Sequence, residues 1–222
     1  MKILCINTSS NLCSVAILEN TTLINKLELN NGLTHSETLM PLIKKLLDIS
    51  KINLKDIDLL AVDIGPGSFT GLRIGIATVK AFADSLSIPC VGISSLEILA
   101  YNVKDDGIIC STIDCKNDNC YFALYELVSN TYTVLEEPQA ETIENVLNLL
   151  DSKYSNKSIS FVGDGIKKES TCNYLNIENL GIAAFKKFKK NNCIGEDILP
   201  LYLKKPQAQK QLEEKMKLQN SK

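Results

Sequence analysis

Short apolar runs and apolar residues at helical spacing predict the elements of the first half of the chain. A strand is predicted where an apolar or alternating run is bounded by polar or glycine turns, and a helix where apolar residues recur every three or four positions. The predicted elements are, in order, a strand with a polar turn at Lys2–Ser9, strands at Cys13–Glu19 and Thr22–Leu29, a helix from Thr34 to about Ile49, a strand at Leu59–Ile64, a helix at Leu72–Asp84, a strand at Cys90–Ile93 and a helix from Ser95 to about Val103.

The second half of the chain repeats this order of elements. Its predicted elements are strands at Ile108–Asp114, Tyr121–Leu127 and Tyr132–Leu135, a helix at Thr142–Leu150, a strand at Ile159–Val162 and a helix at Gly181–Lys190. Three strands followed by helix, strand and helix, given twice, indicate an α/β fold that is duplicated in structure rather than in sequence. Such units are the lobes of the duplicated actin-like or RNase H-like fold. We expect an N-terminal lobe at 1–105, a smaller C-terminal lobe at 106–206 and a polar tail at 207–222.

The predicted helix at Leu72–Asp84 is apolar over more of its surface than one sheet can cover. A helix that is apolar nearly all round is buried from several sides. We expect one stripe to face the chain's own sheet and a second stripe to cover a helix of a partner, because soluble monomers rarely expose large apolar patches. The first stripe is Leu72, Ile76, Val79 and Ala83. The predicted partner-binding residues are Ile74, Thr78 and Phe82 with the flanking Gly71 and Gly75, together with Leu39, Ile43 and Leu47 of the preceding helix.

The turn Gly65-Pro66-Gly67, between the strand and this helix, matches no nucleotide-binding loop. A P-loop has a lysine after its last glycine, whereas Gly71 is followed by Leu72. The dinucleotide fingerprint also fails, because Gly67 and Gly71 stand one residue too far apart. Although a helix amino terminus can hold an anion, we favour a packing turn over a phosphate-binding turn.

Composition limits the compartment and the class of partner. The 222 residues allow a sizeable core, and the formal net charge of −2 gives no global basic field that would attract nucleic acid. No apolar run approaches the length of a membrane span and the amino terminus lacks a signal-peptide pattern, so we expect a cytoplasmic protein with no membrane partner. The eight cysteines are then small hydrophobes, and the spacing of Cys110, Cys115 and Cys120 fits no standard zinc site.

The chain offers few residues for catalysis. His35 is the only histidine, which excludes metal sites and proton shuttles that need two. We interpret Asp114 as a solvated acid at a strand end rather than a magnesium ligand. The turn Gly163-Asp164-Gly165 is too short to indicate an adenosine site. No carboxylate pair at a fixed spacing stands out for acid–base chemistry, so we predict no catalytic, cofactor-binding or metal-binding residues.

Several segments together resemble the bacterial TsaB (YeaZ-type) family, over almost the whole chain. They are Gly65–Ala83 with its Gly-Pro-Gly-Ser-Phe-Thr-Gly-Leu-Arg run, His35–Ile43, Ser94–Ala100, Gly163–Gly165 and Pro200–Lys204. The resemblance implies a two-lobed actin-like fold and a role in making threonylcarbamoyladenosine beside the anticodon of certain tRNAs. In that family the catalyst is the paralogue TsaD, which carries a two-histidine metal motif.

The resemblance therefore implies a noncatalytic subunit that pairs with TsaD, is joined by the ATPase TsaE and contacts tRNA only indirectly. The surface that meets TsaD could also form a homodimer of the isolated chain. Two segments depart from the family pattern: the usual Asp-Thr-Ser is Asn7-Thr8-Ser9, and the usual Asp-Ala-Arg-Arg is Asp114-Cys115-Lys116-Asn117. These departures weaken any nucleotide or RNA contact at those places. The alternative is a stand-alone actin-like ATPase or small-molecule phosphotransferase, which ATP binding and turnover by the isolated chain would indicate.

Overall fold

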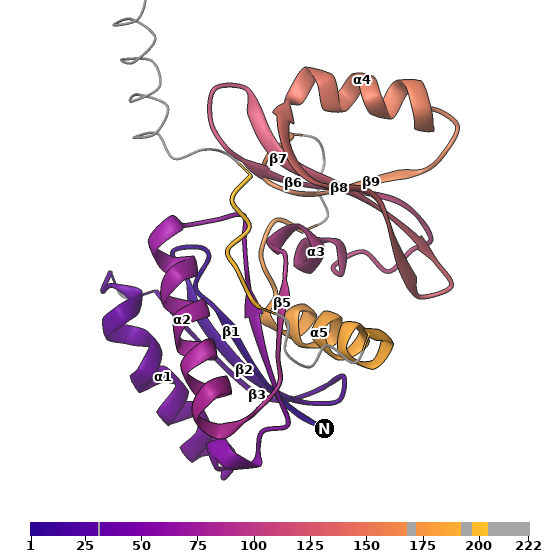
Figure 1. The fold of residues 1–222 in the computed structure, drawn as a ribbon. Helices are drawn as coiled ribbons and strands as arrows, with labels where there is room; N and C mark the ends of the chain where they lie inside the picture. Colours follow the sequence, from indigo (N-terminus) through magenta and orange to yellow (C-terminus); the bar gives the residue numbers. More distant parts are fainter. Residues whose placement is uncertain (31, 168–171, 192–196, 204–222) are drawn as a thin grey trace, which may run out of the picture.

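The computed structural model describes residues 1–30, 32–167, 172–191 and 197–203, which form two lobes with one sheet each (Figure 1). The predicted polar tail at 207–222 lies outside the described residues. The first sheet has five strands in the order β3-β2-β1-β4-β5. Its strands are β1 (Lys2–Asn7), β2 (Cys13–Glu19), β3 (Thr22–Leu29), β4 (Leu59–Asp63) and β5 (Cys90–Ile93).

The second sheet repeats the topology of the first with one strand fewer. Its order is β8-β7-β6-β9, with β6 antiparallel to β7 and parallel to β9, just as β1 is antiparallel to β2 and parallel to β4. The strands are β6 (Gly107–Asp114), β7 (Asn119–Val128), β8 (Thr131–Thr142) and β9 (Ile159–Gly163). The predicted fold class, a duplicated actin-like or RNase H-like α/β fold, is confirmed.

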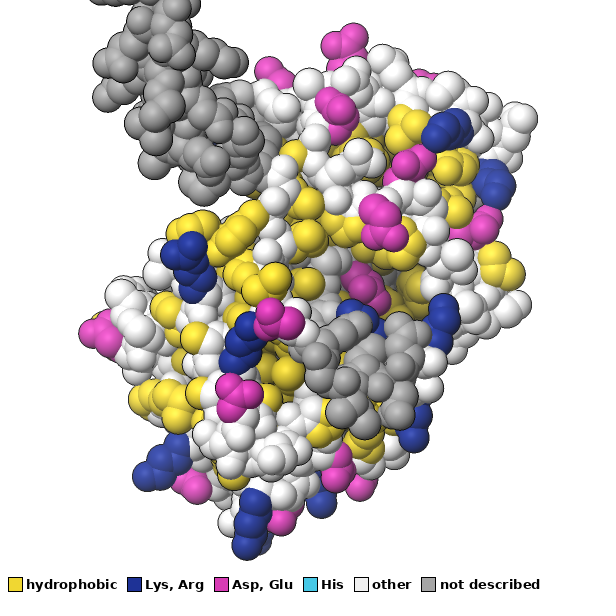
Figure 2. Space-filling model, viewed as in Figure 1, with side chains coloured by type: hydrophobic (Ala, Val, Ile, Leu, Met, Phe, Trp, Pro, Cys, Tyr) yellow, Lys and Arg dark blue, Asp and Glu magenta, His cyan; other side chains and the backbone are white. Residues whose placement is uncertain are grey.

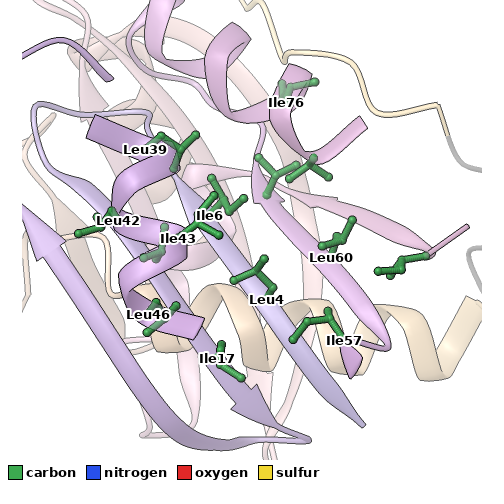
Figure 3. Close-up of a cluster of buried hydrophobic side chains, with 14 of the residues drawn as sticks. Leu4, Ile6, Ile17, Leu39, Leu42, Ile43, Leu46, Ile57, Leu60 and Ile76 are labelled. Atoms are coloured by element: carbon green, nitrogen blue, oxygen red, sulfur yellow. The ribbon is translucent and has the colours of Figure 1, made fainter. Parts of the chain in front are cut away.

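Helices cover both faces of the first sheet. On one face, α1 (His35–Ser50) and α2 (Phe69–Leu86) bury aliphatic side chains against β1, β2 and β4, and Figure 3 shows this core. On the other face, α5 (Ile177–Asn191) packs against the residues that alternate with them in the same strands. Because both faces are covered, β1, β2 and β4 are almost continuously apolar, as strands buried on both sides are.

The second sheet is covered by α3 (Ser95–Ala100) on one face and by α4 (Ile143–Tyr154) on the other. The lobes therefore exchange helices, because α3 follows the first sheet in sequence and packs on the second, whereas α5 follows the second and packs on the first. Ile198 likewise lies in the core of the first lobe, and the Leu201 N–H donates to the Ile64 carbonyl at 2.8 Å. The predicted residue ranges of the lobes remain a prediction, but the packing of α5 and of 197–203 does not follow them.

Element boundaries match the predictions closely where the pattern is strong. The strands at Cys13–Glu19, Thr22–Leu29 and Cys90–Ile93 have the predicted limits. The strand β8 is much longer than the predicted Tyr132–Leu135, because it continues as a partly exposed edge strand with irregular register against β7. One further short element, a 3₁₀ turn at Leu54–Asp56, precedes β4.

Candidate functional site

Polar side chains are buried together where β1 and β4 end. Asp63, the last residue of β4, is fully buried. One of its carboxylate oxygens accepts hydrogen bonds from Ser95 Oγ at 2.7 Å and from the Gly65 N–H at 2.8 Å, and the other lies 2.7 Å from Ser9 Oγ. Ser9 Oγ is also 2.9 Å from Asn7 Oδ1, which accepts the Ser9 N–H. The network joins three segments that are distant in sequence.

The number of protons in this network favours the protonated form of Asp63, which predominates below about pH 6. Ser9 Oγ carries one proton but lies within hydrogen-bond distance of both Asp63 Oδ2 and Asn7 Oδ1. A protonated Asp63 satisfies every atom, because Oδ2–H donates to Ser9 Oγ and the Ser9 hydroxyl donates to Asn7. Burial raises the pKa of Asp63 to about 6, against the lowering effect of its hydrogen bonds.

None of Ser9, Asp63 and Ser95 was predicted as a site residue. Their only signal in the sequence is a lone aspartate at the end of an apolar strand, followed by a glycine turn. The network holds that turn in place, since Gly65 donates to Asp63 through its backbone and has a φ of +102°, a conformation that favours glycine. The Gly65–Pro66 peptide bond is cis. The side chain of Asp63 thus supports the backbone and is not presented to a ligand.

The glycines of α2 pack against Thr8, the residue that follows β1. A Cβ atom on Gly71 would collide with the Thr8 carbonyl oxygen, and one on Gly75 with Thr8 Oγ1. Thr8 Oγ1 in turn donates to the Gly71 carbonyl at 2.7 Å. At both glycines the close approach is to Thr8 of this chain, through its carbonyl oxygen at Gly71 and its hydroxyl at Gly75, so this packing accounts for the glycines without a partner helix. Their partner-binding role stays a prediction.

Leu39 and Ile43 are 1% and 2% exposed in the core of the first lobe, although Ile43 also lines the groove between α1 and α2. They were predicted as partner-binding residues because they lie on the apolar face of α1, but that face packs on the sheet. The other four predicted residues, Leu47, Ile74, Thr78 and Phe82, are half-buried. Their partner-binding role stays a prediction. The own-sheet stripe is confirmed for Leu72, Ile76 and Val79, all buried, whereas Ala83 is half-buried.

An apolar groove runs between α1 and the carboxyl-terminal part of α2. It has a volume of about 360 Å³ and is lined by Met40, Leu47, Ile52 and Phe82 among others. Met40 is 50% exposed, and Ile49 on the same helix is 49% exposed. The surface over α1 and α2 therefore exposes apolar side chains in the free chain.

A second cavity, of about 300 Å³, lies between the two lobes. The first lobe contributes Asn7, Ser9 and Gly67 to its lining, and the second lobe contributes Gly163 and Asp164. No lysine or arginine of the described part of the chain lines it.

Asp114 and His35 have local structural partners. Asp114 Oδ2 is 2.6 Å from Lys116 Nζ, and this contact lowers the pKa of the exposed Asp114 carboxyl. His35 Nε2 lies 2.7 Å from the Ser10 carbonyl oxygen, which it reaches from the first turn of α1. Within the described ranges, no three His, Cys, Asp or Glu side chains gather as metal ligands would. The helices described there also include none of the length and apolarity that crossing a membrane requires.

Comparison with known proteins gives consistent matches over most of the chain. A family profile described as "TsaD: tRNA N6-adenosine threonylcarbamoyltransferase" matches residues 31–192. The "tRNA threonylcarbamoyladenosine biosynthesis protein TsaB" of Buchnera aphidicola subsp. Schizaphis graminum is 36% identical, over 79% of this chain and 84% of that protein. The protein of the same name from Bacillus subtilis is 32% identical, over 73% of this chain and 71% of that protein.

A solved structure matches the fold over a larger share of the chain than these sequence relatives. It is an uncharacterized protein from Pseudomonas aeruginosa with similarity to peptidase YEAZ, and it superposes with a TM-score of 0.76. The two sequences are 26% identical, with 91% of this chain and 99% of the other covered. Together with the sequence relatives, this match shows that the chain belongs to the TsaB (YeaZ) family, within the wider family that the TsaD profile describes.

Proposed function

We propose that this chain is a noncatalytic subunit in the biosynthesis of threonylcarbamoyladenosine in tRNA, and that it acts by binding a TsaD protein. The observation that carries the proposal is the 36% and 32% identity to two proteins named for this pathway, over more than two thirds of each. The match of residues 31–192 to the TsaD profile supports a paralogous partner, because related folds often pair through equivalent surfaces.

The side chains described above support a noncatalytic role. The only histidine contacts a backbone carbonyl, and Asp63 is enclosed in a hydrogen-bond network beneath the glycine turn. The cavity between the lobes lacks a cationic side chain among its described lining residues. General acid–base catalysis needs a titratable group within reach of the substrate, which His35 and Asp63 do not provide. Among the acidic side chains described, Asp164 alone lines the cavity, and it accepts a hydrogen bond from the Asp114 N–H.

The groove between α1 and α2 is the surface that we propose binds TsaD. Met40, Leu47 and Phe82 line it, and Ile74 and Thr78 lie on the adjoining face of α2. Apolar grooves of this kind accept an amphipathic helix, whose apolar side chains complete a small helical bundle. The same surface would form a homodimer of the isolated chain, and TsaE would join the complex of this chain with TsaD.

Co-purification with the TsaD of the same organism tests the proposal, followed by a reconstituted modification assay with and without this chain. We expect a stable complex and threonylcarbamoyladenosine only when both proteins and TsaE are present, measured by nucleoside mass spectrometry. Phe82→Glu should remove the complex while leaving the fold intact by circular dichroism. Modification that is unchanged without this chain, or ATP turnover by the chain alone, would reject the proposal.

A further inference from the structure

The hairpin between β7 and β8 extends from the second lobe to α5, the helix that packs on the first lobe (Figure 1). Its two turn residues, Ser129 and Asn130, both have a positive φ, of 48° and 66°, as the tightest hairpin turns require. The Ser129 N–H donates to Asp106, and the Asn130 carbonyl accepts from Lys186 Nζ of α5 at 3.1 Å. The tip of the hairpin is therefore bound by its own lobe and by a helix of the other lobe.

Two tyrosine rings stack beside this tip. The centre of the Tyr132 ring, on β8, lies 4.1 Å from that of Tyr101, with an angle of 12° between the ring planes. The Tyr132 hydroxyl donates to the Val103 carbonyl at 2.7 Å. Tyr101 is 5% exposed and belongs to the core of the first lobe, whereas Tyr132 packs against the cores of both lobes. The stack thus bridges the two hydrophobic cores.

The ammonium group of Lys186 lies against the same two rings. Its Nζ is 5.3 Å from the centre of each ring, within the range of a cation–π interaction. Burial and the nearby Lys104 lower the pKa of Lys186, so its ammonium group has lost part of its contact with water. No aspartate or glutamate of the described ranges forms an ion pair with it. Figure 2 shows basic side chains beside hydrophobic ones along the boundary between the lobes.

The lobes are joined in a different way at the other end of α3, the helix that Tyr101 ends. Ser95, the first residue of α3, donates from its N–H to the Gly65 carbonyl at 2.8 Å and from its Oγ to Asp63 at 2.7 Å. Ser95 and Asp63 are both fully buried. The lobes are therefore connected by a buried attachment at Ser95 and by a partly exposed one at Lys186.

We propose that Tyr101, Tyr132 and Lys186 form a latch between the lobes, and that its release lets the second lobe rotate about the attachment at Ser95. Contacts between domains of one chain open more readily than a core, and the latch consists of only three side chains. Leu175 links the latch to the cavity between the lobes, because it lines the cavity and packs against the same two cores as Tyr132. Release would therefore change the size of this cavity. The inference does not rest on the proposed function.

Double electron–electron resonance on the full chain tests the latch, with spin labels on non-canonical amino acids at positions 55 and 151. Both positions are exposed, one on the first lobe and one on α4 of the second. The parent chain should give one narrow distance. Lys186→Met, which removes the charge, and Tyr132→Leu, which removes the ring, should each raise the population at other distances about tenfold. The double variant should raise it further, and Lys186→Arg should keep the parent distance.

Two matched controls lie beside the latch. Lys190→Met, at the exposed end of α5, and Thr133→Ala, next to Tyr132 on β8, should leave the distance unchanged. Hydrogen exchange in β6 and β7 separates release of the latch from unfolding, since protection there should persist in every variant.

Three results would overturn the latch. The first is a parent chain whose distances are already broad, and the second is a folded double variant with the distance of the parent. The third is a broadened distance that comes with lost protection in β6 and β7, because Tyr132 and Lys186 would then only stabilise the fold of the second lobe.

Discussion

The ends of β4 and β9 hold topologically equivalent positions in the two lobes, yet one carries a buried acid and the other a glycine. Val62 pairs with Ile6 of β1, and Val162 pairs with Ser111 of β6, so the next residues along, Asp63 and Gly163, correspond. Asp63 fills its site with a hydrogen-bonded carboxyl group. In the second lobe a Cβ atom on Gly163 would collide with the Thr112 carbonyl oxygen. At this strand end, the first lobe therefore fills the space with a side chain, whereas the second lobe fills it with the backbone of the neighbouring strand.

This difference places the acids of the two lobes in opposite environments. In the first lobe the acid is enclosed, and burial raises its pKa to about 6. In the second lobe the acids nearest the strand ends are Asp114 and Asp164, both exposed and linked by a hydrogen bond from the Asp114 N–H to Asp164 Oδ1 at 2.9 Å. The pKa of Asp114 is lowered by Lys116. Duplicated topology thus conserves the path of the backbone but not the chemistry at its turns.

Asp63→Leu should have the largest effect on stability. It removes the acceptor for Ser95 and Gly65 and the partner of Ser9, leaving up to three buried polar groups unpaired. Each unpaired group costs about 1–3 kcal/mol, so we expect a loss of at least about 3 kcal/mol in the free energy of unfolding, measured by urea titration. Asp114→Leu in the second lobe, exposed and paired only with lysine, is the control and should change stability little. Equal losses from both substitutions would remove the contrast between the lobes.

Gly163→Ala should destabilise the second lobe by about 2–4 kcal/mol. The added methyl would meet the Thr112 carbonyl, which cannot move without breaking the β6–β9 pairing, and Gly163 has a φ of +89° that a side chain rarely adopts. Gly32→Ala is a matched control, because Gly32 also has a positive φ, of +77°, but has open space around it. Its smaller loss would isolate the steric part, and thermal unfolding of both variants measures the difference.

Asp63→Asn should change how stability depends on pH. Since folding raises the pKa of Asp63 from 3.8 to about 6, the folded chain binds more protons than the unfolded chain in this range, and stability falls as pH rises from about 4 through 6. The asparagine amide can donate to Ser9 Oγ while its carbonyl accepts from Ser95 and Gly65, which mimics the protonated acid. We expect the variant to match the parent near pH 4 and to exceed it at pH 8, by at most about 3 kcal/mol.

Urea titrations at pH 4.5, 6 and 8 measure this dependence. Asp114→Asn should act in the opposite direction and weakly, because a lowered pKa contributes stability above the unfolded value that is lost as pH falls. A pH profile unchanged by Asp63→Asn would show that folding does not raise the pKa of the Asp63 carboxyl group.

The strands of the first lobe could be predicted from the sequence, but the buried hydrogen-bond network around Asp63 could not. Cys13–Glu19 and Cys90–Ile93 were predicted to the residue, because apolar runs between turns are local signals. The helix α2 begins at Phe69, where Ser68, one of the two hydroxyl residues before it that the sequence offers as caps, accepts the Gly71 N–H at its Oγ. The network around Asp63 could not be predicted, because its partners lie 54 and 32 residues away and meet only when the sheet forms.

The glycines of α2 show the same limit. Their spacing indicated that another part of a chain approaches the helix closely, but it carried no information about which residue does so. Thr8, at the end of β1, occupies that place in the folded chain, 63 residues away in sequence from the carbonyl of Gly71 that it contacts. The buried stripe of α2 could be predicted, because local helix geometry alone decides which side chains share one face.

Ser111→Ala should have the smallest effect and the opposite sign. Ser111 occupies in β6 the place that Ile6 occupies in β1, and its hydroxyl is fully buried with no hydrogen-bond partner in the described structure. Removing an unsatisfied hydroxyl relieves its desolvation penalty, so we expect a gain of up to about 1 kcal/mol.

The adjacent Thr112 provides the control for Ser111→Ala. Its hydroxyl accepts the Ile166 N–H at 3.2 Å and lies 3.4 Å from the Val162 carbonyl oxygen. Thr112→Val keeps the shape of the side chain and should lose about 1 kcal/mol, because the Ile166 N–H is left buried and unpaired. Urea titrations of the two variants should therefore move in opposite directions. A loss of stability from Ser111→Ala would mean that the Ser111 hydroxyl has a hydrogen-bond partner in solution. The second sheet would then stabilise this position by a hydrogen bond, where the first sheet does so by packing the side chain of Ile6.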